Sequence, residues 1–217
     1  MIDLHTHTFF SDGVLSPNEL VQRARKQGYE AIAITDHVDI SNIEFIVKEI
    51  VNFCNSVKNY YDDILVIPGV EITHVHPNQI NEIAEFSKKH GAKIVVVHGE
   101  TIIEPVEYGT NRKALESPYV DILAHPGLIS EEDIKIAIKN SKYIEITTKK
   151  GHSITNGYVA SICKKLGAKM VLNTDTHTPE NLITDEFAIK SLIGAGLSYE
   201  ESIQVLQNSK DLIKSLI

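Results

Sequence analysis

The chain alternates short runs of apolar, often β-branched residues with longer segments of helical period, and this alternation restricts its fold more than any other feature. Seven such runs occur, at residues 2–5, 31–35, 64–71, 94–98, 120–125, 143–147 and 169–175. Strands that alternate with helices are typical of a parallel sheet, because a helix must return the chain to the start of the next parallel strand. The pattern therefore predicts an α/β fold of about seven repeated units.

Signals for helix boundaries fall between these runs. Helix starts are indicated at Ser16-Pro17, Thr178-Pro179 and Ser198, and helix ends at Gly28, Gly91 and Gly167. An eight-unit barrel takes about 250 residues, roughly 31 for each unit, so a chain of 217 residues fits about seven units. We therefore expect residues 1–217 to form a single domain, a distorted (β/α)7 TIM-like barrel, in preference to an open doubly wound sheet.

Histidines and carboxylates recur at the carboxyl ends of the predicted strands. Six of the ten histidines and three acidic residues fall there. These nine residues are His5, His7, Asp12, His37, Glu71, His98, His125, Asp175 and His177. The carboxyl ends of barrel strands converge on one rim, where active sites on this architecture are built, so we expect the nine side chains to meet. Asp12 alone lies in a segment, Ser11-Asp12-Gly13, that equally suits an ordinary turn.

The local spacing of these residues suits metal binding. Residues i and i+2 of a strand face the same side. His5 with His7 therefore forms one bidentate chelate, and Asp175 with His177 forms a second. If the barrel closes, the first and last strands are neighbours and the two chelates lie side by side. Imidazole and carboxylate together favour Zn, Mn or Fe over Mg or Ca. Nine donor side chains are more than the coordination number of a single ion that keeps positions open for water. More than one metal ion is therefore expected.

Together these segments resemble the PHP (polymerase and histidinol phosphatase) domain family. The motifs that carry the resemblance are His5-Thr6-His7-Thr8, Ser11-Asp12-Gly13, Ile34-Thr35-Asp36-His37, Gly69-Val70-Glu71, Val97-His98, Ala124-His125-Pro126 and Asn173-Thr174-Asp175-Thr176-His177. They occur in this order along essentially the whole chain. The resemblance implies a distorted seven-unit barrel that holds three divalent metal ions, Zn, Mn or Fe, and hydrolyses phosphoesters.

The resemblance also implies how the donors are shared, and it favours Asp12 as a ligand. One ion would be held by His5, His7, Glu71 and Asp175, a second by Glu71, His98 and His125, and a third by Asp12, His37 and His177. The expected function is a small-molecule phosphomonoesterase similar to a histidinol phosphatase, with Glu71, Asp175 and His177 as catalytic residues. A metal-activated hydroxide would attack phosphorus in line, so no Ser or Cys nucleophile is needed. A metal-bound water, Asp175 or a nearby histidine would protonate the leaving group.

Two other functions remain open, a nuclease or nucleotide phosphodiesterase and a non-catalytic binding subunit of a larger assembly. Candidates for contact with the substrate are Lys149, Lys150, Arg112, His74 and His76. Arg112 lies in residues 99–118, the longest segment without a clear period, which is a candidate lid over the site. Asp3 and Asp36 are candidates for orienting imidazoles. The sixth run, 143–147, contains no predicted ligand.

Composition limits the partners of the chain. With 21 basic and 29 acidic residues the net charge is −8, which predicts a small phosphorylated substrate and no extended nucleic-acid surface. No apolar run approaches the ~18 residues of a spanning helix, and Met1 leads directly into the first strand, so neither a membrane segment nor a signal peptide is expected. Cys54 and Cys163 lie on apolar helix stripes and are expected to be buried thiols of a cytoplasmic protein.

Overall fold

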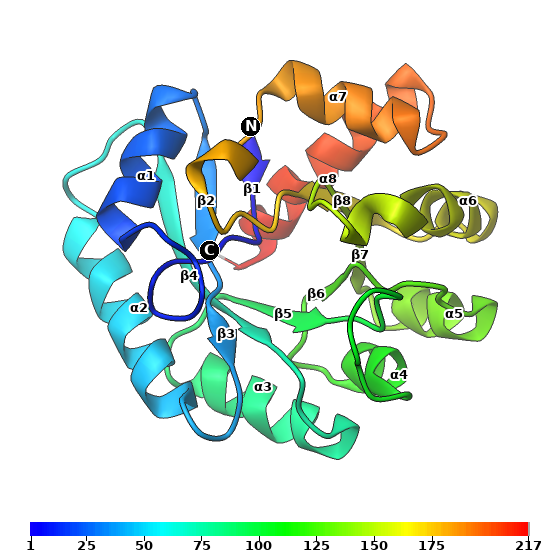
Figure 1. The fold of residues 1–217 in the computed structure, drawn as a ribbon, viewed down its shortest axis with the longest axis horizontal. Helices are drawn as coiled ribbons and strands as arrows, with labels where there is room; N and C mark the ends of the chain where they lie inside the picture. Colours follow the sequence, from blue (N-terminus) through cyan, green and yellow to red (C-terminus); the bar gives the residue numbers. More distant parts are fainter. Residues whose placement is uncertain (217) are drawn as a thin grey trace.

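The computed structural model describes residues 1–216, and its framework is a ring of parallel strands surrounded by helices (Figure 1). The strands are β1 (Ile2–Asp3), β2 (Ala31–Ile34), β3 (His37–Val38), β4 (Leu65–Ile72), β5 (Ile94–His98), β6 (Ile122–Ala124), β7 (Tyr143–Thr147) and β8 (Met170–Asn173). The α-helices are α1 (Pro17–Lys26), α2 (Ile43–Val57), α3 (Ile80–Lys89), α4 (Thr110–Glu116), α5 (Glu131–Lys139), α6 (Asn156–Leu166), α7 (Asp185–Gly194) and α8 (Tyr199–Leu216). Short 3-10 helices lie at Pro77–Gln79, His152–Thr155 and Pro179–Asn181.

The strands follow one another around the ring in the order β1-β2-β4-β5-β6-β7-β8, with parallel pairing throughout and β3 paired to β4. β2 and β3 belong to one unit, because the chain departs from the ladder at Thr35-Asp36 and rejoins it at His37. The result is a nearly closed barrel of seven parallel strands, which confirms the predicted (β/α)7 TIM-like barrel and rejects the open sheet.

Side chains complete the closure between β1 and β8. Backbone pairing there consists of an isolated bridge between Thr6 and Thr176. The Leu4 amide donates to Asn173 Oδ1 at 2.9 Å, and the Thr174 hydroxyl donates to Asp3 Oδ2 at 2.5 Å. The first strand is therefore shorter than the predicted run of residues 2–5. It ends at Asp3, and the residues that follow are joined to the last unit mainly through side chains.

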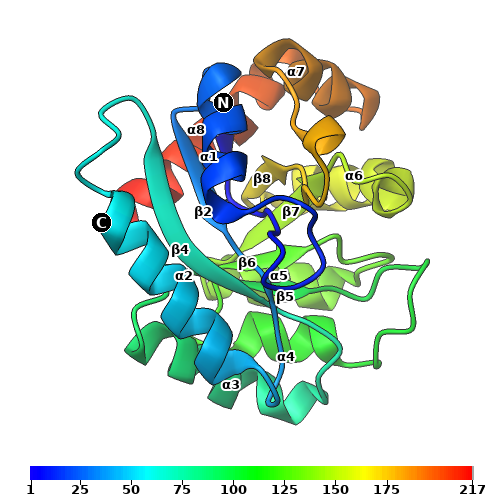
Figure 2. The ribbon, with the colours of Figure 1, turned by 60° about the vertical axis from the view of Figure 1, so that its left-hand side comes forward.

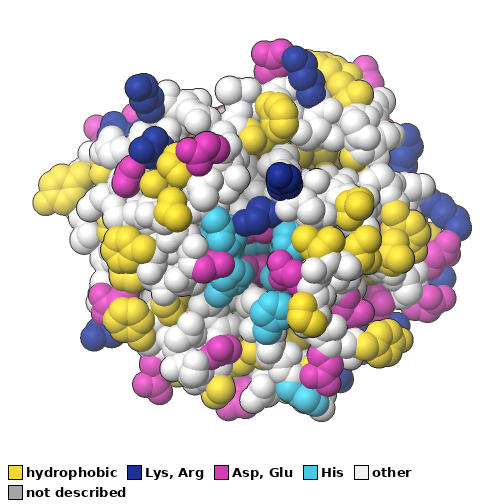
Figure 3. All heavy atoms as spheres, in the orientation of Figure 1, with side chains coloured by type: hydrophobic (Ala, Val, Ile, Leu, Met, Phe, Trp, Pro, Cys, Tyr) yellow, Lys and Arg dark blue, Asp and Glu magenta, His cyan; other side chains and the backbone are white. Residues whose placement is uncertain are grey.

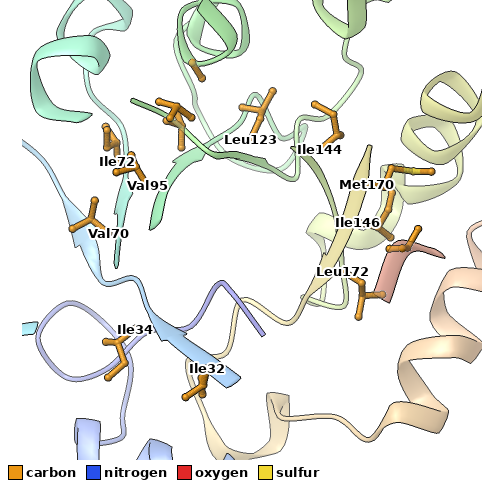
Figure 4. Close-up of a cluster of buried hydrophobic side chains, with 14 of the residues drawn as sticks. Ile32, Ile34, Val70, Ile72, Val95, Leu123, Ile144, Ile146, Met170 and Leu172 are labelled. Atoms are coloured by element: carbon orange, nitrogen blue, oxygen red, sulfur yellow. The ribbon is translucent and has the colours of Figure 1, made fainter. Parts of the chain in front are cut away.

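Strand residues alternate between an inner and an outer apolar layer. Ile32, Ile34, Ile144 and Ile146 point outward to the helices (Figure 4), whereas Ala31 and Ala33 belong to a second cluster inside the ring. The inner cluster includes Leu212 and Ile213 of α8, which packs against β8 and β1. The other helices lie around the outside, as α2 does alongside β4 (Figure 2). Burial of one face per helix and two faces per strand holds the barrel together.

Two predicted segment boundaries differ from the structure. Thr178-Pro179 begins only a single 3-10 turn, and α7 starts at Asp185 after the cap residue Thr184, because the chain returns to an extended conformation at Leu182. In the 99–118 segment, residues 110–116 form α4, so the irregular part is confined to residues 99–109. Ser16 caps α1 and Ser198 caps α8 as expected.

Both cysteines are buried and free, as predicted. Burial raises the pKa of each thiol to about 12, so neither is a ready nucleophile. Within residues 1–216, no helix combines the length and the apolar character needed to cross a bilayer.

Candidate metal centre

Glu71 lies at the centre of the predicted ligands. It follows Val70 near the carboxyl end of β4, and strand alternation turns its side chain into the ring, where it is fully buried. Its Oε1 lies 3.3 Å from His5 Nε2 and 3.7 Å from His125 Nε2. Its Oε2 lies 2.8 Å from His37 Nδ1 and 3.5 Å from His7 Nε2. One carboxylate thus faces four imidazoles from three different parts of the barrel.

Asp175 occupies a second central position, on the segment that follows β8. Its Oδ1 lies 3.3 Å from His7 Nε2 and 3.1 Å from His177 Nδ1, and its Oδ2 lies 3.7 Å from His125 Nε2. The His7 and His177 rings stack with centroids 4.1 Å apart. The chelates of the first and last units therefore lie side by side, as the closed barrel required. Asp175 and His125 have positive φ values of 52° and 25°, a strained conformation typical of functional sites.

Asp12 faces imidazoles from the turn after β1. Its Oδ1 lies 3.1 Å from His177 Nε2 and 3.4 Å from His37 Nε2. Partial burial raises the pKa of Asp12, but the hydrogen bond from His177 and the charge of His37 outweigh it and hold this pKa below its usual range. Asp36 fixes the same turn by accepting from the Thr8 hydroxyl at 2.7 Å and the Ser11 hydroxyl at 2.7 Å. Its contacts position the turn that carries Asp12, whereas it was expected to orient an imidazole.

Buried polar atoms in this cluster lack hydrogen-bond partners. Within residues 1–216 they include both oxygens of Glu71, both ring nitrogens of His7 and His125, and His5 Nε2. Burial and the charge of His37 lower the pKa of His7 to about 3, and burial with the charge of His98 lowers that of His125 well below its usual value. Neutral imidazole is the form that binds a metal ion. Unpaired lone pairs that converge on buried carboxylates fit divalent cations well.

The donor atoms separate into small groups, each with its atoms within 4.8 Å of one another. These groups are His7-Asp12-His37-His177, His5-His7-Glu71, His98-His125-His152, His5-His125-Glu145 and His74-His98-Glu104. The first contains the whole third set implied by the family resemblance, and the second contains three of the four donors of the first set. The pair His98 and His125 of the second set is also together. All nine predicted ligands therefore meet at one end of the barrel.

Three acidic or histidine side chains join the cluster without having been predicted. Glu145 of β7 is buried, and its Oε2 lies 2.8 Å from His5 Nδ1, although the sixth run was expected to contribute nothing. Its inward position between Ile144 and Ile146 was readable from strand alternation. Glu104 lies in the irregular segment 99–109 and His152 begins the short 3-10 helix His152–Thr155, and neither has a repeat long enough to indicate where a side chain points.

Asp3 was expected to orient an imidazole but mainly joins the two edges of the barrel. It accepts from Thr174 through both the amide and the hydroxyl, and more weakly from the His5 amide at 3.3 Å. Burial raises the pKa of Asp3 to about 7. Its role in the structure is closure of the ring beneath the first chelate.

The five predicted substrate contacts separate into two that reach the pocket and three that do not. Lys149 Nζ lies 3.0 Å from the carbonyl oxygen of Asp175 and contacts His177 Nδ1, and His74 also lines the pocket. Lys150 is exposed outside it. Arg112 forms an ion pair with Asp133 on the neighbouring helix, and His76 is an exposed helix cap beside Glu107. The structure therefore does not bring Arg112, Lys150 or His76 to the cluster.

The histidine cluster opens into a pocket of about 470 Å³. Figure 3 shows it as a hollow ringed by histidines, with acidic and basic side chains at its edge. Its lining comprises Ser11, Asp12, His37, Val38, Asp39, Asn42, Thr73, His74, His98, Glu104, Lys149, His152, Asp175 and His177. Among the described residues, Lys149 is the single Lys or Arg in this lining. The space is of the size that small-molecule sites commonly have.

The chain is similar to known proteins over most of its length. The chain is 51% identical over 215 residues to an uncharacterised protein of Methanocaldococcus jannaschii, and the match covers 99% of each chain. It is 28% identical over 193 residues to a protein of Acetivibrio thermocellus named a probable phosphatase, covering 82% of this chain and 79% of the relative.

Two solved structures have a similar fold. A chain of an archaeal ribonuclease P complex superposes with a TM-score of 0.73 at 15% identity, covering 98% of this chain and 89% of that one. A putative metal-dependent phosphoesterase from Bifidobacterium adolescentis superposes with a TM-score of 0.50 at 16% identity, covering 91% and 96%. Residues 3–101, which include six of the nine predicted ligands, match the family model of the PHP domain. The chain belongs to the PHP domain family.

Proposed function

We propose that this protein is a phosphoesterase that hydrolyses small phosphomonoesters with three divalent ions, Zn, Mn or Fe, held by the nine predicted ligands. The observation that carries the proposal is the buried carboxylate of Glu71, whose two oxygens face four imidazoles and have no hydrogen-bond partner among the described residues. Membership of the PHP family and the probable phosphatase relative support the same chemistry. The number of three ions rests on the family resemblance, and two of the donor groups, His7-Asp12-His37-His177 and His5-His7-Glu71, support two of the three ligand sets that it implies.

Divalent ions at such a centre make a coordinated water acidic enough to act as nucleophile near neutral pH and neutralise charge on the phosphoryl oxygens. The side chains of the protein supply the arrangement. Glu71 would hold two of the ions, because its two oxygens face different pairs of imidazoles. Asp175 and His177 join the two ends of the barrel at the pocket floor, which keeps the ligands of separate strands in one geometry.

Lys149 and the shape of the pocket favour a small ester. The Lys149 ammonium lies against Asp175 at the pocket, where it would bind a phosphoryl oxygen as a point charge. Among the described residues the lining carries one basic side chain, Lys149, and, outside the nine predicted ligands, the carboxylates of Asp39 and Glu104, so it offers no row of positive charges for the successive phosphates of an oligonucleotide. No Phe, Tyr or Trp of residues 1–216 lines the pocket, so the larger aromatic rings on which single-stranded nucleic acids commonly stack are not among its described lining residues. These features favour a phosphomonoester over the nuclease alternative.

The test compares wild type with Asp175→Asn on a panel of phosphomonoesters, with metal content measured by mass spectrometry. Wild type should contain about three ions and release phosphate, and a chelator should abolish the release. Asp175→Asn should lose about 100-fold or more in kcat/KM, because a central donor is gone. Asp63→Asn, which removes an exposed carboxylate paired with Arg25, serves as the matched control and should match wild type. Turnover that survives the chelator, or salt-dependent cleavage of oligonucleotides in preference to monoesters, would contradict the proposal.

A further inference from the structure

Glu104, which lies outside the nine predicted ligands, places its carboxylate against three imidazoles. It belongs to residues 99–109, the irregular segment between β5 and α4. Its Oε2 lies 3.0 Å from His98 Nε2 and 3.7 Å from His74 Nε2, and its Oε1 lies 3.3 Å from His152 Nε2. A single carboxylate from this segment therefore contacts three histidines, with His98 the nearest of them.

The contact between His98 and Glu104 requires a cation. His98 Nδ1 lies 3.2 Å from the carbonyl oxygen of Gly99, which can only accept, so Nδ1 carries the proton. When the ring is neutral, its Nε2 presents a lone pair to Glu104 Oε2 at 3.0 Å, whereas the Nε2–H of a protonated ring would donate to this oxygen. Two lone pairs at this distance repel unless a proton or a metal ion lies between them. Two donors about 2.1 Å from one ion lie roughly 3.0 to 3.4 Å apart at coordination angles of about 90° to 109°, which agrees with the separation observed.

His152 is suited to hold Glu104 and is poorly placed to share an ion with His125. Its Nδ1 lies 2.8 Å from Thr101 Oγ1, which leaves its Nε2 toward Glu104. Its ring stacks on that of His125 with centroids 4.1 Å apart and an interplanar angle of 17°. Lone pairs of imidazole lie in the ring plane, so two nearly parallel stacked rings cannot both direct them at one ion.

We propose that Glu104 is a tenth metal ligand, which binds the ion held by His98, His125 and Glu71 and thereby fastens the 99–109 segment over the pocket. This inference rests on the proposed metal centre. The base of the segment is fixed independently of any ion, because the Glu100 carboxylate accepts from the amides of Gly109 and Asn111. Its tip is exposed at Ile102 and Tyr108. Glu104 is therefore the residue through which occupation of the centre orders this tip.

The experiment measures metal affinity and protease resistance in Glu104→Gln, with Glu107→Gln as the matched control. Glu107 lies three residues along the same segment and pairs only with the exposed His76 among the described residues. Glutamine keeps an oxygen that accepts a hydrogen bond but loses the charge of a ligand. Apo protein is titrated with Zn²⁺ and with Mn²⁺ against a chromophoric chelator, and cleavage of residues 99–109 is followed by mass spectrometry with and without the ion.

In wild type and Glu107→Gln, the ions should protect residues 99–109 from cleavage. In Glu104→Gln, one of the bound ions should bind about 10- to 100-fold more weakly and protection should be lost, while the remaining ions are unaffected. Glu104→Asp, which keeps the carboxylate on a shorter stem, should fall between, and circular dichroism verifies that each variant is folded. Unchanged affinity and protection in Glu104→Gln, or a change confined to KM for the substrate, would overturn the inference. Absence of bound ions in wild type would instead overturn the proposed function.

Discussion

Glu145 illustrates how a buried carboxylate can support a metal centre through a neighbouring imidazole. Its Oε2 accepts from His5 Nδ1 at 2.8 Å and from Asn173 Nδ2 at 2.9 Å. Because the carboxylate accepts from Nδ1, it selects the tautomer of His5 that turns the Nε2 lone pair toward Glu71. Glu145 is therefore a positioning residue for the first chelate.

Replacement of Glu145 by glutamine should weaken the centre while leaving the fold intact. Glutamine has nearly the same volume but no charge, and its amide can rotate to offer a donor to His5. We expect metal affinity or kcat/KM to fall about 10- to 100-fold, measured by chelator competition and by phosphate release. Glu132→Gln on the exposed side of α5 is the control and should match wild type. A variant with wild-type metal affinity would show that Glu145 acts only as a buried hydrogen-bond acceptor.

The turn that follows β6 is tightly packed against the start of the 99–109 segment. Gly127 has a φ of +62°, and a Cβ there would lie 1.9 Å from the carbonyl oxygen of Glu100. The same turn carries His125, whose own backbone is strained. Close approach of two backbones thus positions a proposed ligand and the loop that carries Glu104.

Gly127→Ala should destabilise the protein far more than the same change at Gly109. Both glycines have positive φ, but no heavy atom lies within 4 Å of a Cβ at Gly109. We expect a loss of about 1 kcal/mol for Gly109→Ala from backbone strain alone and of more than about 2 kcal/mol for Gly127→Ala, measured by denaturant unfolding. Equal losses would mean that the turn after β6 can move aside without cost.

Among the neighbouring strands described, β1 and β8 have the least backbone hydrogen bonding, and this junction closes the barrel. Ladder pairing there is reduced to the bridge between Thr6 and Thr176, and the side chains of Asp3 and Asn173 provide further hydrogen bonds. The two chelates stand on opposite sides of this join. Closure of the ring and alignment of the metal ligands therefore depend on the same contacts.

Asn173→Ala should lower both stability and metal affinity. The change removes two buried hydrogen bonds and leaves the Leu4 amide without its acceptor, for an expected loss of about 2 to 4 kcal/mol in the free energy of unfolding. Asn208→Ala removes a part-buried hydrogen bond to the Met170 carbonyl oxygen and an exposed one from Gln204, and should cost about 1 kcal/mol with unchanged metal affinity. A wild-type unfolding midpoint and metal affinity for Asn173→Ala would show that the join does not depend on this side chain.

Patterns along the chain were enough to predict the seven-unit barrel and the convergence of the nine strand-end donors, because strand alternation and the parallel order of βα units are local properties. They did not predict that α8 contributes Leu212 and Ile213 to the inner cluster, or that Arg112 turns away to Asp133. Nor did they place Glu104 and His152, which reach the site from an irregular segment and from a short 3-10 helix. Direction in such segments depends on contacts between distant residues, such as Thr101 with His152, and these contacts exist only once the barrel has formed.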